Sequence, residues 1–250
     1  MYEEELEFAN QIAERADEIA MRSFGGEFAV ELKADRTPVT QADLEIEAMI
    51  REEVARRFPE DAVLGEEQGL VGDSDRVWVI DPIDGTKNFA AGIQIWGTLI
   101  ALVDGGDPVV GVASAPALGE RYAAARAGGA TLNGEAIHVS AVERVSDAFV
   151  LFGTLAWDDP ANERRLADLV KAATRTRAFG DFWGHMLVAR GAAEAMIEEE
   201  LRTWDTSAVR VIVQEAGGRM TSFGGTALQD RGSVLTTNGR LHDELVARLS

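Results

Sequence analysis

A short apolar run that ends in two closely spaced carboxylates constrains the fold of this chain more than any other stretch. Residues Val77–Ile80 are β-branched or aromatic and predict a buried strand. Asp81-Pro82 follows directly, and because proline cannot continue a ladder of strand hydrogen bonds, we expect the strand to end there. Gly85 favours a sharp turn, which predicts a tight loop for Asp84, Gly85 and Thr86. The strand thus delivers a carboxylate to its own C-terminal end.

Two carboxylates this close together repel each other unless a cation lies between them. Asp81 and Asp84 are therefore candidate metal ligands, and their hard oxygen donors suit Mg²⁺ or Mn²⁺ better than zinc. The alternative is an ordinary Asp-Pro and Asp-Gly turn with solvated side chains. This segment alone does not separate the two interpretations.

Composition narrows the class of protein. The 250 residues are 46% hydrophobic and can bury a sizeable core, as one large domain or two closely packed halves. Cysteine is absent, which excludes disulfide scaffolds, cysteine–zinc sites and a cysteine nucleophile. The formal charge of −19 argues against binding to nucleic acid or anionic membranes. The acidic N-terminus is unlike a signal peptide and no apolar run could span a bilayer, so we expect a cytoplasmic protein.

Hydrophobic periodicity predicts the elements around the acidic strand. Helices are expected over about 4–23, 40–58, 161–173, 183–193, 205–217 and 241–249. Strands are expected over about 62–65, 77–81, 93–103, 109–115, 121–125, 137–139, 149–152, 219–222 and 234–236. Several consecutive strands are separated by glycine turns, a meander that predicts a largely antiparallel sheet. The order of elements favours layers of helices packed on such sheets.

Further acidic residues lie near the ends of predicted elements. Asp43 is placed to stabilise the start of the second helix, and Asp205 is at a position typical of an N-cap. Glu66 and Glu67 follow a short strand. Capping or solvation explains each of these residues singly. The position of Glu66 just before the Val77 strand nevertheless allows it to converge on the two aspartates that follow that strand.

Taken together, four segments resemble the inositol monophosphatase superfamily of Mg²⁺-dependent, lithium-sensitive phosphatases, over nearly the whole chain. They are Val39-Thr40-Gln41-Ala42-Asp43, Gly65-Glu66-Glu67, Asp81-Pro82-Ile83-Asp84-Gly85-Thr86, and Trp204-Asp205 followed by Glu215-Ala216-Gly217-Gly218. The resemblance implies an α+β fold, a layered α-β-α-β-α sandwich of the inositol monophosphatase/fructose-bisphosphatase type with mostly antiparallel sheets. It also implies one phosphatase unit over residues 1–250, with a metal-site half over about 1–140 and a substrate-reading half over about 141–250, and a homodimer.

The family pattern implies a metal site made of oxygen donors. Its ligands would be Glu66, Asp81, Asp84, Asp205 and the backbone carbonyl of Ile83. They would hold two or three Mg²⁺ ions, with Mn²⁺ as an alternative. Such ions neutralise phosphate oxygens and lower the pKa of bound water, which also explains how so acidic a protein could bind a phosphate ester.

The same pattern implies roles in catalysis. Asp43 would pair with the Thr86 hydroxyl to activate the attacking water, and Glu66 would count with them as a catalytic residue. The backbone amides of Gly85 and Thr86 would receive the phosphate, and Glu67 would help to orient the ligands. The mobile loop that closes over the site in this family would carry Lys33 and Asp35.

The second half of the chain indicates which ester is bound. Inositol-type members carry Gly-Ser-Ala-Ala or Gly-Thr-Ala-Ala where this sequence has Gly180-Asp181-Phe182-Trp183. With residues 89–102 and 112–119, this segment resembles the histidinol-phosphate phosphatase branch found in actinobacteria. Histidinol phosphate carries an ammonium and an imidazole, which acidic and aromatic side chains would complement. The predicted substrate contacts are Asp84, Asp181, Trp183, Glu198 and Asp205, with Phe182 as the other candidate ring. Alternatively, the two rings only begin a core helix. For Asp181, capping of that helix and substrate binding are compatible.

The resemblance therefore implies Mg²⁺-dependent hydrolysis of L-histidinol phosphate to L-histidinol and phosphate, a step of histidine biosynthesis. Two alternatives stay open. One is an inositol-1-phosphate phosphatase or a broad-specificity phosphomonoesterase of the same fold, and the other is a non-catalytic relative that binds phosphorylated metabolites. A bisphosphatase for fructose or a nucleotide is disfavoured, because nothing in the sequence supplies a second phosphate site.

Overall fold

The computed structural model describes residues 2–25, 30–32, 38–155, 157 and 159–250, in which helices alternate with short strands. The helices are α1 (Glu3–Ser23), α2 (Gln41–Arg57), α3 (Thr86–Ala90), α4 (Pro160–Ala172), α5 (Asp181–Ala189), α6 (Thr203–Glu215) and α7 (His242–Leu249), with a 3₁₀ turn at Val145–Asp147. The strands are β1 (Val30–Leu32), β2 (Pro38–Thr40), β3 (Ala62–Gly65), β4 (Gly69–Val71), β5 (Arg76–Asp84), β6 (Gly97–Asp104), β7 (Asp107–Ala115), β8 (Glu120–Ala125), β9 (Gly129–Leu132), β10 (Glu135–Ile137), β11 (Phe149–Phe152), β12 (Arg175–Arg177), β13 (Ala195–Arg202), β14 (Arg219–Thr221) and β15 (Arg231–Thr237).

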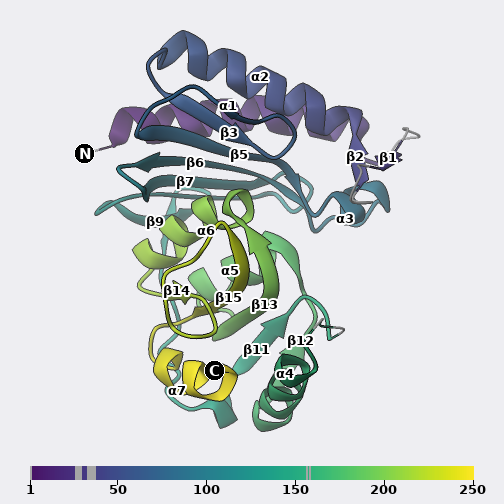
Figure 1. Cartoon of the computed structure of the whole chain (residues 1–250), viewed down its shortest axis with the longest axis vertical. Helices are drawn as coiled ribbons and strands as arrows, with labels where there is room; N and C mark the ends of the chain where they lie inside the picture. Colours follow the sequence, from purple (N-terminus) through teal and green to yellow (C-terminus); the bar gives the residue numbers. More distant parts are fainter. Residues whose placement is uncertain (1, 26–29, 33–37, 156, 158) are drawn as a thin grey trace.

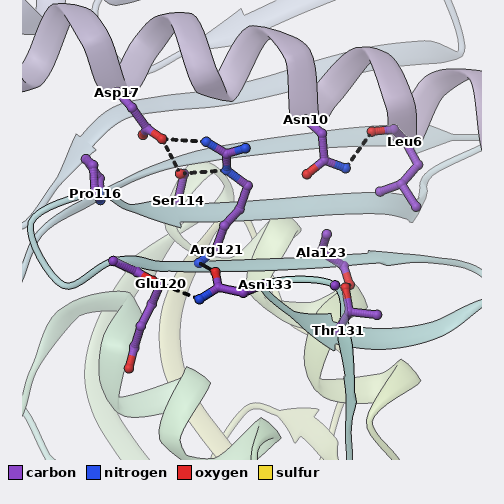
Figure 2. A pocket seen from close by; sticks show the side chains of 12 residues that line it. Leu6, Asn10, Asp17, Ser114, Pro116, Glu120, Arg121, Ala123, Thr131 and Asn133 are labelled. Atoms are coloured by element: carbon purple, nitrogen blue, oxygen red, sulfur yellow. Dashed lines mark hydrogen bonds and ion pairs between the residues drawn. The ribbon is translucent and has the colours of Figure 1, made fainter.

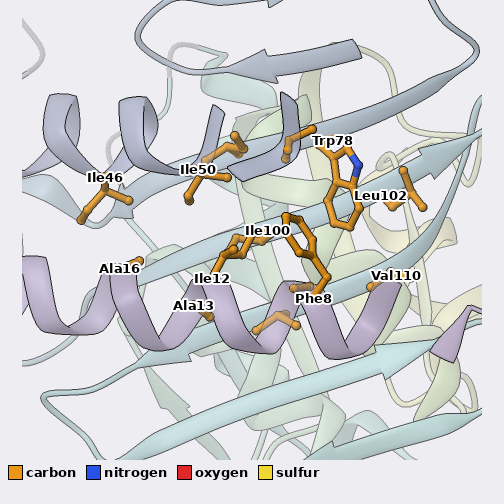
Figure 3. Close-up of a cluster of buried hydrophobic side chains, with 14 of the residues drawn as sticks. Phe8, Ile12, Ala13, Ala16, Ile46, Ile50, Trp78, Ile100, Leu102 and Val110 are labelled. Atoms are coloured by element: carbon orange, nitrogen blue, oxygen red, sulfur yellow. The ribbon is translucent and has the colours of Figure 1, made fainter. Parts of the chain in front are cut away.

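The first large sheet has eight strands in the order β10-β9-β8-β7-β6-β5-β3-β4, and only β3 and β5 pair in parallel. Helices α1 and α2 cover one of its faces (Figure 1). Figure 3 shows Phe8 and Ile12 of α1 and Ile50 of α2 meeting Trp78 and Leu102 of the sheet. Each large apolar side chain buried in this way contributes roughly 1.5–3 kcal/mol. The amphipathic spacing of the two helices thus holds them against the strand that carries the acidic motif.

The second sheet lies on the far side of helices α5 and α6 and has the order β12-β11-β13-β15-β14. Strand β11 pairs in parallel with β12 and β13, whereas β15 is antiparallel to β13 and β14. Helices α4 and α7 cover its outer face (Figure 1). The layers therefore run helix, sheet, helix, sheet, helix, which confirms the predicted α+β sandwich with mostly antiparallel sheets.

Strand β5 does not end at Asp81-Pro82, as the sequence predicted, but continues to Asp84. Its register with β6 shifts between Asp81 and Asp84, which marks a bulge. Pro82 lies inside this bulge, where a missing N–H costs no ladder hydrogen bond. The Thr98 hydroxyl of β6 donates to the Pro82 carbonyl at 2.8 Å and ties the bulge to the neighbouring strand.

The boundaries near α6 also differ from those predicted. Residues Ala195–Arg202 form strand β13, which is not among the predicted strands; its glutamates are uncommon in strands. Helix α6 begins at Thr203 with Arg202 as its N-cap, so Asp205 is the third helical residue and not the cap. The strand forms because its partners β11 and β15 lie far away in the sequence.

Two smaller differences concern the meander. Strand β6 begins at Gly97, not Ile93. The Ile93 amide donates to the Asn88 carbonyl at 2.9 Å and the Ile95 carbonyl accepts from the Asn88 side chain at 2.8 Å, so these groups bond to the turn after α3 instead of a neighbouring strand. Residues Gly129–Leu132 form strand β9, which is not among the predicted strands because Gly128-Gly129 favours a turn. Within the described residues, none of the helices combines the length and apolar character needed to cross a lipid bilayer.

Candidate active site

The parallel strands β3 and β5 bring the first two acidic residues side by side. Gly65 of β3 is in register with Ile80 of β5, so Glu66 and Asp81 follow at the same level. The Glu66 amide donates to the Ile80 carbonyl at 3.2 Å. The sheet itself thus places these two carboxylates at one edge, as expected for the C-terminal ends of neighbouring parallel strands.

The turn after the bulge brings Asp84 and Thr86 to the same edge. Gly85 has a φ of +80°, and a Cβ there would lie 2.9 Å from the Ile95 carbonyl oxygen, so both conformation and space require glycine. Helix α3 begins at Thr86, whose hydroxyl donates to the Ile83 carbonyl at 2.9 Å. The tight loop predicted here is confirmed in its outline.

Asp205 joins this group from the first turn of α6. Its Oδ2 accepts a hydrogen bond from the Arg202 amide at 2.7 Å. One oxygen from each of Asp81, Asp84 and Asp205 lies within 4.8 Å of the others. Among the described residues, Asp81 Oδ1 is buried without a hydrogen-bond partner. Three converging carboxylates with an unsatisfied oxygen form a donor set that fits a hard divalent cation.

Burial and mutual repulsion raise the pKa of these carboxyl groups. Burial and then the charges of Glu66 and Asp84 raise the pKa of Asp81 well above its usual range. Burial and then the charges of Asp181 and Asp205 do the same for the pKa of Asp84. Burial raises the pKa of Asp205 to about 6, against the effect of the backbone amide that it accepts. A cluster of this kind must either hold protons or bind cations.

Asp43 lies in the first turn of α2 and is fully buried. Its Oδ2 accepts hydrogen bonds from the Thr40 amide at 2.8 Å and the Thr40 hydroxyl at 2.5 Å, which confirms the predicted capping of α2. The charge of Asp43 also raises the pKa of Asp81, so this capping residue lies within electrostatic reach of the cluster. Its pairing with the Thr86 hydroxyl stays a prediction.

A pocket of about 300 Å³ opens over the acidic cluster. Its lining consists of Glu66, Asp81, Ile83, Asp84, Gly85, Thr86, Lys87, Asp181, Leu201 and Asp205. Lys87 is the one cationic side chain in this lining, and sequence reasoning missed it. Its position directly after the Gly85-Thr86 turn was the available signal. Burial raises the pKa of the Asp181 carboxyl, and the positive charge of Lys87 opposes that shift.

Asp181 and Glu198 extend the group of acidic residues beyond the three aspartates. Asp181 has a φ of +59°, and its Oδ2 accepts a hydrogen bond from Asn88 Nδ2 at 2.9 Å. Gly180 is the N-cap of α5, so the prediction that Asp181 caps this helix is wrong. Burial, and then the charge of Asp181, raises the pKa of Glu198 to about 8. A Cβ at Gly153 would lie 2.3 Å from the Glu198 carboxylate, so glycine makes room for this acid.

The two aromatic residues after Asp181 have different surroundings. Phe182 is buried between α5 and the first sheet, and its amide donates to Asp84 Oδ2 at 2.6 Å. The core alternative is therefore confirmed for Phe182. Trp183 is half-buried and its indole N–H donates to Glu120 of β8 at 2.9 Å. Trp183 is not among the residues that line the pocket, and its contact with substrate stays a prediction.

Glu67 lies next to Glu66, and its amide donates to Glu47 Oε2 at 2.8 Å. Glu47 is a fully buried residue of α2 that sequence reasoning also missed, because a glutamate in a helix is usually solvated. The remaining predicted positions, Lys33 and Asp35, lie outside the described residues.

A second cavity, of about 410 Å³, lies between α1 and strands β7 to β9 (Figure 2). Arg121 crosses it and donates to Asp17 Oδ2 at 2.7 Å and to the Ser114 hydroxyl at 3.1 Å. Ser114 in turn donates to Asp17 at 2.8 Å. Among the described residues, the group of three converging carboxylates lies at the smaller pocket and not in this cavity.

Comparison with known proteins agrees with this geometry. The sequence pattern that describes the inositol monophosphatase family matches residues 1–250. The chain is 42% identical to a histidinol-phosphatase of Streptomyces coelicolor, covering 100% of this chain and 98% of that protein. It is 43% identical to a histidinol-phosphatase of Mycobacterium tuberculosis, covering 100% and 99%. The structure of an inositol monophosphatase from Zymomonas mobilis superposes with a TM-score of 0.90 at 30% identity, covering 100% of this chain and 98% of that one. The chain is therefore a phosphatase of the inositol monophosphatase family, whose members depend on metal ions.

Proposed function

We propose that this phosphatase hydrolyses L-histidinol phosphate to L-histidinol and phosphate, and so serves histidine biosynthesis. The observation that carries the proposal is the second pair of acids, Asp181 and Glu198, beside the three-aspartate cluster. In the part of the chain that the structure describes, Lys87 is the one cationic side chain in the pocket lining, and its charge acts on the Asp181 carboxyl, so the pocket has more acidic groups than this lysine can balance. A substrate with its own ammonium supplies positive charge, whereas inositol phosphate does not. The full-length relatives named as histidinol-phosphatases support the same choice.

The chain's own residues divide the work in this proposal. Glu66, Asp81, Asp84, Asp205 and the Ile83 carbonyl hold the cations, which we expect to be two or three Mg²⁺ ions, or Mn²⁺. When bound, such ions neutralise the phosphate oxygens, acidify water and stabilise the leaving alkoxide. Glu66 is also one of the proposed catalytic residues. Glu67 helps to orient the metal ligands.

Substrate and water are handled by neighbouring groups. The attacking water would pass its proton through the Thr86 hydroxyl to the Asp43 carboxylate, which acts as the base, and the amides of Gly85 and Thr86 would receive the phosphate, since the first amides of a helix are not used within it. Asp181 and Glu198, with Asp84 and Asp205, complement the ammonium and imidazole of the substrate.

The decisive assay is Mg²⁺-dependent phosphate release from histidinol phosphate and inositol-1-phosphate, side by side. We expect a large preference for histidinol phosphate. Asp181→Asn should lower its kcat/KM by roughly 10- to 100-fold, the scale of a hydrogen bond to a charged group, and change hydrolysis of the inositol ester less. Asp243→Asn, an exposed residue of α7, is the matched control and should leave both rates unchanged. A preference for inositol-1-phosphate would refute the substrate assignment and leave the phosphatase assignment intact.

A catalytically silent relative is the second candidate, and Asp81→Asn separates it from an enzyme. Loss of phosphate release with an unchanged circular dichroism spectrum supports catalysis through the acidic cluster. Undetectable turnover of any phosphomonoester by the native protein with Mg²⁺ would favour the binding role. A homodimer, which rests on the family resemblance, and a cytoplasmic location belong to the same proposal.

A further inference from the structure

We propose that Glu47 is a positioning residue that fastens the turn carrying Glu66 to helix α2 and thereby sets the affinity of the site for divalent cations. This inference rests on the proposed role of Glu66 as a metal ligand. It does not depend on which phosphate ester is hydrolysed.

Glu47 holds the turn through both of its carboxylate oxygens. Its side chain is 0% exposed, in the interior of a helix that packs on the first sheet. Oε2 accepts the Glu67 amide at 2.8 Å, and Oε1 accepts the Gln68 amide at 3.0 Å. These are the two amides that directly follow Glu66. Charge-assisted bonds of this kind are stronger than neutral ones, so the turn is tied to α2 and not left to solvent.

Arg51, one helical turn further along α2, completes the attachment. Its Nε donates to Glu47 Oε1 at 2.9 Å, which balances the buried charge. Its Nη1 and Nη2 donate to the carbonyls of Val63 at 3.2 Å and Gly69 at 2.6 Å. Val63 lies on β3 and Gly69 on β4, the two strands that the turn joins. The Glu47–Arg51 pair therefore forms hydrogen bonds to both strands of the hairpin and to its turn.

The Glu47 carboxylate approaches the hairpin closely at Gly65. A Cβ at this position would lie 2.3 Å from Glu47 Cδ. Its φ is not among the left-handed values of the chain, so close approach and not backbone conformation accounts for glycine here. The absence of a side chain at Gly65 therefore leaves the space that the Glu47 carboxylate occupies.

Glu47 also lies four residues after Asp43, on the same face of α2. One helix therefore carries both Asp43 and the attachment of Glu66. Releasing the turn should let Glu66 move relative to Asp81 without removing any proposed ligand. Partners that orient metal ligands typically contribute 10- to 100-fold in metal affinity, which sets the expected effect at about tenfold or more.

The test is Mg²⁺ binding to the native protein and to Glu47→Gln, measured by calorimetry without ester, together with the Mg²⁺ concentration that half-saturates phosphate release. In Glu47→Gln, the dissociation constant for Mg²⁺ and the half-saturating Mg²⁺ concentration should both rise by about tenfold or more. The KM for the ester at saturating Mg²⁺ should change less. Glu53→Gln is the matched control, because Glu53 is a nearly buried acid of the same helix that pairs with Arg15 and Arg56, away from the turn. It should alter thermal stability while Mg²⁺ affinity stays within about twofold.

Glu47→Asp is the second variant to measure if Glu47→Gln does not fold, since it keeps the charge beside Arg51 and only shortens the side chain. We expect its Mg²⁺ affinity to lie between that of the native protein and that predicted for Glu47→Gln. In the native protein, hydrogen exchange at the Glu67 and Gln68 amides should be slow for a turn. A folded Glu47→Gln that binds Mg²⁺ as tightly as the native protein, or fast exchange at both amides, would overturn the proposal. Weakened Mg²⁺ binding in a protein that does not hydrolyse histidinol phosphate would support the positioning role and refute the proposed function.

Discussion

Replacing Glu198 by Gln should stabilise the metal-free protein at alkaline pH. Burial and the charge of Asp181 raise the pKa of Glu198 from 4.5 to about 8, so the folded protein resists ionising this group. In the unfolded chain the carboxyl ionises freely. Between pH 4.5 and about pH 8, Glu198 is protonated in the folded protein and ionised in the unfolded chain. The free energy of unfolding is therefore highest below pH 4.5 with respect to this group, and it falls as pH rises toward 8.

The size of the effect follows from the two pKa values. Each unit corresponds to about 1.36 kcal/mol, so the shift from 4.5 to about 8 costs the native protein roughly 4 to 5 kcal/mol at pH 8.5 and about 1 kcal/mol at pH 5. Gln is neutral at every pH and its amide oxygen can still accept the Asp181 amide. The Glu198→Gln variant should therefore gain about 4 kcal/mol over the native protein at pH 8.5, and far less at pH 5.

Urea unfolding in EDTA at pH 5 and pH 8.5, followed by circular dichroism, measures this difference. Glu200→Gln is the control, because Glu200 is an exposed acid of the same strand, paired with Arg231, and should change stability by under about 0.5 kcal/mol at both pH values. An equal gain at both pH values, or none at pH 8.5, would show that burial does not destabilise the Glu198 carboxylate. The argument that the Glu198 carboxylate needs a cationic substrate to stabilise its charge would then fail.

Other changes probe the rest of the site. Asp81→Asn should reduce phosphate release by about 100- to 1,000-fold with an unchanged circular dichroism spectrum; retained activity would contradict its place in the cluster. EDTA should abolish activity, and added Mg²⁺ should restore it and raise the melting temperature of the native protein more than that of Asp81→Asn. Gly65→Ala should lower the free energy of unfolding by about 1 to 3 kcal/mol in urea, because its Cβ would collide with Glu47. Trp183→Phe removes the bond to Glu120 and should cost about 1 kcal/mol of stability with little change in KM; a large KM increase would instead place Trp183 at the substrate.

The local elements near the acidic motif could be predicted because neighbouring residues agree on one structure. Thr40 and Asp43 mark the start of α2 in the sequence, and the structure realises both bonds of that capping box. The apolar spacing of α1 likewise predicts a helix and its buried face. These signals act over a few residues, so tertiary packing does not overrule them.

Glu47 and Lys87 show where this reasoning stops. A glutamate in a helix and a lysine after a turn are most often solvated, and nothing nearby in the sequence distinguishes these two. Glu47 is buried because a hairpin around residue 67 needs partners for its amides. The division of the chain into a metal-site half and a substrate-reading half also stays a prediction, since Asp181 and Asp205 of the second half line the same pocket as Asp81 and Asp84.

The residues that could do the chemistry can be identified from the sequence: a strand leading into Asp81 and Asp84, a glycine turn after them, and acids at Glu66 and Asp205. Which of these residues meet depends on the packing of distant elements. Glu66 reaches Asp81 because β3 and β5 pair in parallel, and Asp205 arrives because α6 packs between the two sheets. Contacts between residues more than a hundred positions apart depend on how whole layers pack, and local periodicity carries no record of that packing.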